Sequence, residues 1–121
     1  MNKKILIVDD DPRNIFALKL TLKARGFDIE TALSAKEAID KLAIDKNIDL
    51  ILMDMMMPDI DGYQAIGMIG KIDGLDHIPI IAVTAQAMEE DYQKCIDAGA
   101  TDYIKKPIDV DQLLNVIEKV S

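Results

Sequence analysis

Four acidic residues of this 121-residue chain stand directly after apolar runs. Asp9, Asp10 and Asp11 follow the run "ILIV", and Asp54 closes the run "LILM". A buried strand resists such charges, because an ionised carboxylate without a partner loses much free energy when it leaves water. We therefore expect these acids to lie at open strand ends, or to meet a positive partner there.

Carboxylates that share one site suggest a bound cation. Each disfavours the ionisation of the others, and a hard cation relieves that repulsion. Mg²⁺ fits best, because it takes oxygen ligands from carboxylates, water and phosphate. The single cysteine, Cys95, and the single histidine, His77, form no cluster for a softer metal.

Phosphoryl transfer is the reaction that these residue types favour. A carboxylate can attack phosphorus, and the transfer needs mainly a metal, a lysine and hydrogen-bond donors around the phosphoryl oxygens. Asp54, Asp10, Thr84 and Lys106 provide such groups after four different apolar runs. Each also has a simpler interpretation as a helix cap or a solvated loop residue, and Asp11 is expected to cap a helix. The combination favours one phosphoryl site.

The alternation of apolar runs with amphipathic stretches indicates how these residues are positioned. Continuous apolar runs are typical of strands buried on both faces, and the amphipathic stretches between them predict helices. We predict strands over residues 3–9, 27–32, 49–54, 78–84 and 101–105.

A helix is predicted after each strand. The first begins at Asp11 and ends at Gly26, and the capping box of Ser34 and Glu37 opens the second. The other three run through residues 63–69, from about 87 to 99, and from about 109 to 120. This alternation predicts a parallel sheet covered on both faces, which binds ligands beyond the carboxyl ends of its strands.

Composition narrows the class of protein. The length suits one domain, residues 1–121, and half of the residues are hydrophobic. The net charge of -8, from 14 basic and 22 acidic residues, disfavours direct binding of nucleic acid. The apolar runs are far shorter than the roughly 20 residues of a membrane span, and no signal peptide is visible. We therefore expect a cytoplasmic protein without a membrane partner.

Four segments resemble the receiver domains of response regulators in two-component signalling, including the chemotaxis receivers. These segments are "ILIVDDD", "DLILMDMMMPDIDGY", "IPIIAVTA" and "AGATDYIKKPID", and their order and spacing match as well. The resemblance covers essentially the whole chain. It implies a flavodoxin-like, doubly wound parallel sheet of five strands in the order 2-1-3-4-5, with five helices.

The resemblance also implies a role for each acid. Asp54 would take a phosphoryl group from a phosphohistidine on a histidine kinase or a histidine phosphotransfer protein. Asp10 would bind Mg²⁺ directly and Asp9 mostly through water, together with Asp54 and the backbone carbonyl of Met56. The domain would catalyse only its own phosphorylation and dephosphorylation.

The remaining implied roles concern the switch. Lys106 would pair with the phosphoryl group, and its peptide bond to Pro107 would be cis. Thr84 would donate a hydrogen bond to a phosphoryl oxygen. Tyr103 would then rotate inward from a solvent-facing position. The surface of the fourth helix, fifth strand and fifth helix would change, and a downstream protein would read it.

Two other functions fit the sequence less well, and the architecture of the whole protein stays open. "DIDG", residues 59–62, superficially fits the signature of haloacid-dehalogenase-type phosphatases, but it follows Pro58 and not an apolar strand. A flavodoxin-like interaction module has no need of this set of residues at four strand ends. The chain is either a stand-alone receiver or a piece of a hybrid histidine kinase.

Overall fold

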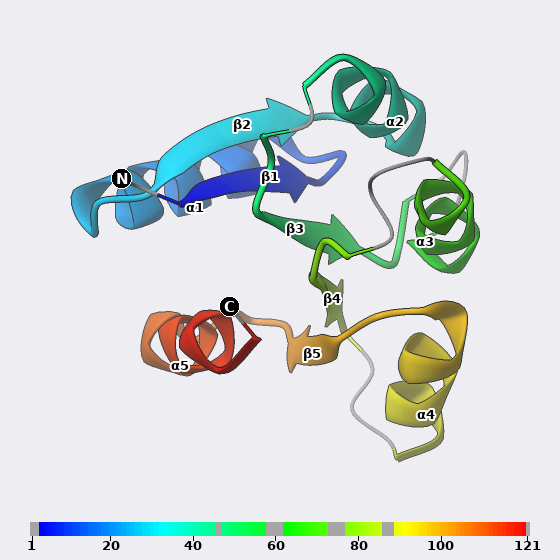
Figure 1. Ribbon diagram of the computed structural model, residues 1–121. Coiled ribbons are helices and arrows are strands. Elements are labelled where there is room, and N and C mark those ends of the chain that lie inside the picture. The colour runs from blue at the N-terminus through cyan, green and yellow to red at the C-terminus, as the bar shows by residue number, and fades with distance from the viewer. Residues whose placement is uncertain (1–2, 46, 58–61, 73–76, 86–88, 121) are drawn as a thin grey trace.

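A five-stranded parallel sheet forms the centre of the computed structural model, which describes residues 3–45, 47–57, 62–72, 77–85 and 89–120. The strands are β1 (Lys4–Val8), β2 (Asp28–Ala32), β3 (Leu50–Asp54), β4 (Ile80–Thr84) and β5 (Asp102–Lys105). They pair in parallel in the order β2-β1-β3-β4-β5 (Figure 1). This confirms the predicted flavodoxin-like fold and strand order.

One helix follows each strand and covers one face of the sheet. The helices are α1 (Pro12–Ala24), α2 (Ala35–Ile44), α3 (Gly62–Gly70), α4 (Glu89–Ala98) and α5 (Val110–Val120). Buried side chains of α1 and α5 pack on one face, with Ile5, Ile7 and Leu52. Those of α2, α3 and α4 pack on the other, with Leu6, Val8 and Met53. Alternate residues of the same strands thus feed two separate cores, which explains why the strands are apolar throughout.

Side chains at the helix ends explain where α1 and α2 begin. Asp11 caps α1, because its carboxylate accepts a hydrogen bond of 2.9 Å from the backbone N–H of Arg13. Ser34 accepts one of 3.1 Å from the N–H of Glu37. The Glu37 carboxylate departs from the predicted capping box, because it accepts from the N–H of Leu33 at 3.0 Å.

Most predicted boundaries differ from the observed ones by one or two residues. The largest difference among the strands is in β4, which begins at Ile80 and not at residue 78. Pro79 precedes it and has no N–H to donate, although its carbonyl accepts from Ile51 at 3.0 Å. The predicted start of α4 near residue 87 lies outside the described residues. In the part of the chain that the structure describes, no helix is long and apolar enough to cross a membrane.

Candidate functional site

The two central strands carry acidic residues into the interior at their carboxyl ends. Asp54 is the last residue of β3, and Asp9 directly follows β1, where its N–H donates to Ala32 at 3.1 Å. Their exposed fractions are only 2% and 4%, because helices cover both faces of the sheet. Charges this deeply buried require nearby compensation.

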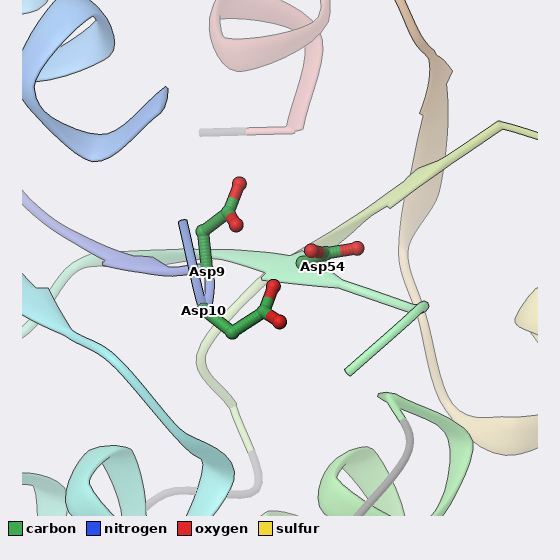
Figure 2. A group of neighbouring side chains, drawn as sticks. All are labelled: Asp9, Asp10 and Asp54. Atoms are coloured by element: carbon green, nitrogen blue, oxygen red, sulfur yellow. The ribbon is translucent and has the colours of Figure 1, made fainter. Parts of the chain in front are cut away.

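The three acids Asp9, Asp10 and Asp54 form one cluster. Each offers a carboxylate oxygen, and these three oxygens lie within 4.8 Å of one another. Figure 2 shows the three side chains at the ends of two neighbouring strands. Asp10 is exposed, so the cluster opens to solvent on its side. The structure thus brings together acids that stand 44 positions apart in the sequence, counting from Asp10 to Asp54.

The electrostatics of the cluster favour a positive partner. Burial raises the pKa of the Asp9 carboxyl, and the neighbouring charge of Asp54 raises it further. The backbone N–H of Asp11 donates to Asp9 at 2.9 Å and opposes this shift, as does the charge of Lys106. A cluster that makes an acid hold its proton more tightly is one that a cation would stabilise.

Lys106 supplies one positive charge to this cluster. Its Nζ lies 3.3 Å from Oδ2 of Asp54. The other oxygen, Oδ1, accepts a hydrogen bond of 2.9 Å from the N–H of Met56. The backbone of Lys106 is itself held, because its N–H donates to the carbonyl of Thr84 at 2.7 Å. The Lys106–Pro107 peptide bond is cis, as the resemblance implied.

The donor set fits a hard divalent cation. Three carboxylates provide oxygen ligands, and one of them is exposed enough to leave room for water in the coordination shell. Asp11 does not join them, because its carboxylate caps α1 and pairs with Arg13, which lowers the pKa of Asp11. The structure thus selects Asp9 and Asp10 from the three consecutive acids.

Thr84 and Tyr103 lie on the strands next to the cluster. Thr84 ends β4 and is buried, one position beyond the residue that pairs with Asp54. Tyr103 is half-buried against the core under α2, α3 and α4. Its ring lies 4.9 Å from that of Tyr92 in α4, at an interplanar angle of 57°. The expected solvent-facing position of Tyr103 therefore applies to only part of its surface.

The loop after β3 divides the methionines that follow Asp54. Met55 and Met57 are buried, whereas Met56 is 55% exposed. Its carbonyl, a predicted metal ligand, stays a prediction. Pro58 and the acids of the "DIDG" segment, residues 59–61, lie outside the described residues.

Gly62 is a positioning residue that the sequence analysis missed. A Cβ atom at this first position of α3 would lie 2.6 Å from Cα of Met55 and 3.0 Å from the carbonyl oxygen of Asp54. Only a residue without a side chain allows α3 to begin this close to the acid-bearing end of β3. The sequence shows a glycine there, but the close approach follows from tertiary packing.

Comparisons with known proteins agree with this fold. The family model described as the response regulator receiver domain matches residues 5–118. Hybrid signal transduction histidine kinase I of Dictyostelium discoideum is 41% identical over an alignment of 121 residues, gaps included. The alignment covers 95% of this chain and 7% of the kinase. Polar-differentiation response regulator DivK of Brucella ovis is 36% identical over 118 residues, 98% of this chain and 95% of DivK. Chemotaxis protein CheY4 of Vibrio cholerae has a similar solved structure, with a TM-score of 0.94, 27% identity and full coverage of both chains.

These relatives include both protein architectures left open by the sequence. The chain spans a small part of the hybrid kinases and nearly the whole of DivK, so its context remains either a stand-alone receiver or part of a hybrid kinase. Receiver domains act as phosphoacceptors in signalling and pair with histidine kinases or histidine phosphotransfer proteins. On its matched segment and its fold, this chain belongs to the response regulator receiver domain family.

Proposed function

We propose that Asp54 is the phosphoacceptor of this receiver and that residues 1–121 form one domain. One observation carries the proposal: the buried Asp54 carboxylate lies 3.3 Å from the Lys106 ammonium and shares one cluster with the acids that follow β1. Such an arrangement supplies a nucleophile together with the charges that phosphoryl transfer requires. The donor is a phosphohistidine on a histidine kinase or a histidine phosphotransfer protein.

Asp9, Asp10, Asp54 and the carbonyl of Met56 would hold Mg²⁺. When bound, the ion neutralises part of the charge on the acids and on the incoming phosphoryl oxygens. The protein holds Asp54 in a fixed orientation, because Lys106 and the N–H of Met56 each engage one carboxylate oxygen. The two contacts pre-position the nucleophile, which lowers the entropic cost of reaction.

Lys106 and Thr84 would bind the phosphoryl group once it is attached. Phosphorylation replaces the single negative charge of the Asp54 carboxylate with roughly -1.5 to -2 units on the phosphoryl group. Lys106 neutralises part of that charge, and the Thr84 hydroxyl donates a hydrogen bond to a phosphoryl oxygen. Because Thr84 is buried beside β5, its movement opens space that Tyr103 fills by rotating farther inward. This population shift changes the surface of α4, β5 and α5 that a downstream protein reads.

Phosphoryl incorporation tests the assignment of Asp54. The protein is incubated with a phosphorylated histidine phosphotransfer protein and Mg²⁺, and its intact mass is measured. Asp54→Asn should abolish the addition of one phosphoryl group, whereas Asp40→Asn, at an exposed position of α2, should leave it intact. Incorporation that persists in Asp54→Asn would contradict the proposal.

Lys106→Ala tests the separation of ion binding from switching. We expect this variant to bind Mg²⁺ but to lose the spectral change that phosphorylation causes at Tyr103. Lys105→Ala is the matched control, because Lys105 is exposed and precedes Lys106 directly. A normal Tyr103 response in Lys106→Ala would remove Lys106 from the mechanism.

The proposed cellular location and partners follow from the same role. A receiver of this kind works in the cytoplasm, where its kinase presents the phosphohistidine, and it signals through protein contacts without binding nucleic acid or membrane. The net charge of -8 supports that choice of partner, because nucleic-acid phosphates and anionic lipid surfaces repel it.

A further inference from the structure

A cavity of about 530 Å³ opens beside the candidate site, between α1 and the start of α5. Asp9 and Lys106 line it at one end, and both flank the Asp54 carboxylate. Figure 2 shows Asp9 pointing away from Asp10, toward the side where the helices α1 and α5 lie. The cavity therefore begins where the phosphoryl group would be transferred.

The rest of the cavity wall is mainly apolar. Leu18 of α1 faces Pro107, Ile108 and Val110, which lead from β5 into α5. A volume of this size, with mainly apolar walls and a few polar groups, is typical of sites for small molecules. None of the comparisons or proposed roles above uses this space.

We propose that this cavity is a leaving-group pocket, which makes the receiver react faster with small acyl phosphates whose acyl group is apolar. The inference rests on the proposed role of Asp54 as acceptor. In phosphoryl transfer the attacking and leaving oxygens lie roughly in line through phosphorus. The leaving group therefore points away from Asp54, and the proposal places it in the cavity that Asp9 and Lys106 line.

The reaction itself is balanced without any further reactant. An oxygen of the Asp54 carboxylate forms a bond to phosphorus, and the bond between phosphorus and the acyl oxygen breaks. The electron pair of that bond leaves with the acyl group as a free carboxylate. An acyl phosphate suits this site because its leaving group needs no proton. The site therefore needs no general acid, and Asp9 and Lys106 keep their interactions with Asp54.

Rates of phosphorylation by acetyl and pentanoyl phosphate test the pocket. The two leaving acids have nearly the same acidity, so the three added methylene groups isolate the effect of the cavity. Full burial of three methylene groups would give roughly a fiftyfold preference. Because the cavity is open on one side, we expect pentanoyl phosphate to react about tenfold faster, equivalent to about 1.4 kcal/mol. A ratio near one would overturn the proposal.

Variants that fill the cavity provide a second test. Ala17→Phe and Thr21→Leu each place a larger side chain on the α1 wall, and both should reduce the ratio of the two rates toward one. Ala24→Phe is the matched control, because Ala24 is exposed on the same helix outside the cavity lining, and it should keep the wild-type ratio. A preference that survives both filling variants would place the acyl chain elsewhere.

A binding measurement separates failure of this inference from failure of the proposed function. The probes are phosphonate analogues of both acyl phosphates, in which a methylene group replaces the bridging oxygen and blocks transfer. We expect the pentanoyl analogue, but not the acetyl analogue, to shift the amide resonances of Leu18 and Val110. If the phosphorylated phosphotransfer protein labels the chain but no acyl phosphate does, the pocket proposal fails and the proposed function stands. If neither donor labels the chain, the proposed function fails, and these shifts alone decide whether the pocket exists. Their absence would refute it.

Discussion

Replacing Lys106 with methionine should destabilise the folded protein by about 2–3 kcal/mol when divalent cations are absent. The variant keeps the length of the side chain but removes the ammonium that lies 3.3 Å from Asp54. Loss of one partner of a buried ion pair costs about 3–5 kcal/mol. We expect the smaller cost of about 2–3 kcal/mol because 27% of the Lys106 side chain is exposed, against 3% for Asp54.

The cost of Lys106→Met should be smaller when Asp54 is also replaced by asparagine, and the acids around Asp54 determine by how much. At an effective dielectric constant of about 20, a pair at 3.3 Å attracts by roughly 5 kcal/mol. Two carboxylates no more than 4.8 Å apart repel by roughly 3.5 kcal/mol or more. Asp54→Asn removes both terms, so we expect its own effect on stability to be small. In that background Lys106→Met should cost less than about 1 kcal/mol, because the ammonium has lost its main partner.

Urea unfolding of the four proteins in this double-mutant cycle, in a buffer with a chelator, measures the coupling directly. We expect a coupling of about 2 kcal/mol, and Lys105→Met as the exposed control should change stability by less than about 0.5 kcal/mol. A coupling below about 0.5 kcal/mol would show that Lys106 does not compensate the buried charge of Asp54. Magnesium should reduce the deficit of Lys106→Met, because the ion supplies positive charge to the same acids.

Three further perturbations address neighbouring residues. Because the folded-state pKa of Asp9 is raised, its contribution to stability is present below its unfolded pKa and is lost as the pH rises through the folded pKa. Asp9→Asn should flatten that decline in cation-free unfolding curves measured at increasing pH, and a decline parallel to that of the wild type would contradict this. Gly62→Ala should destabilise the protein by about 1–3 kcal/mol in urea unfolding, because its Cβ would overlap the backbone of Met55, and an unchanged midpoint would exclude the close approach. Tyr92→Ala should lower stability by about 1 kcal/mol and weaken the near-ultraviolet circular dichroism of Tyr103; an unaltered spectrum would show that the two rings do not pack in solution.

The order of the elements and the convergence of the acids were predictable because both follow from local patterns. Apolar runs buried on both faces specify parallel strands, and parallel strands bring their carboxyl ends to one edge. That rule alone places Asp10 near Asp54 across 44 positions of sequence, as the structure shows. The helix cap at Asp11 was equally local, since its partner is two residues away.

Features that depend on packing between distant segments were not predictable in the same way. The distance from Gly62 to Met55 is set by how α3 docks on β3, and the ring contact of Tyr103 with Tyr92 by how α4 lies on β5. The cavity beside Lys106 lies between α1 and the segment that leads from β5 into α5. None of these has a sequence pattern of its own, because each depends on the angle between two elements.

The backbone of β4 and β5 offers a short physical route from the site to the surface of α4. Thr84 pairs with Lys105, and its carbonyl accepts the N–H of Lys106 at 2.7 Å, so the two proposed phosphoryl ligands are linked by main-chain hydrogen bonds. Tyr103 pairs with Ala82 two positions earlier on the same two strands, and its ring contacts Tyr92 of α4. A displacement of Thr84 thus needs to be transmitted over only two residues before it alters an aromatic contact with a helix. A change in the environment of Tyr92 on phosphorylation, absent in Lys106→Ala, would show that the site and the surface of α4 are energetically coupled along this route.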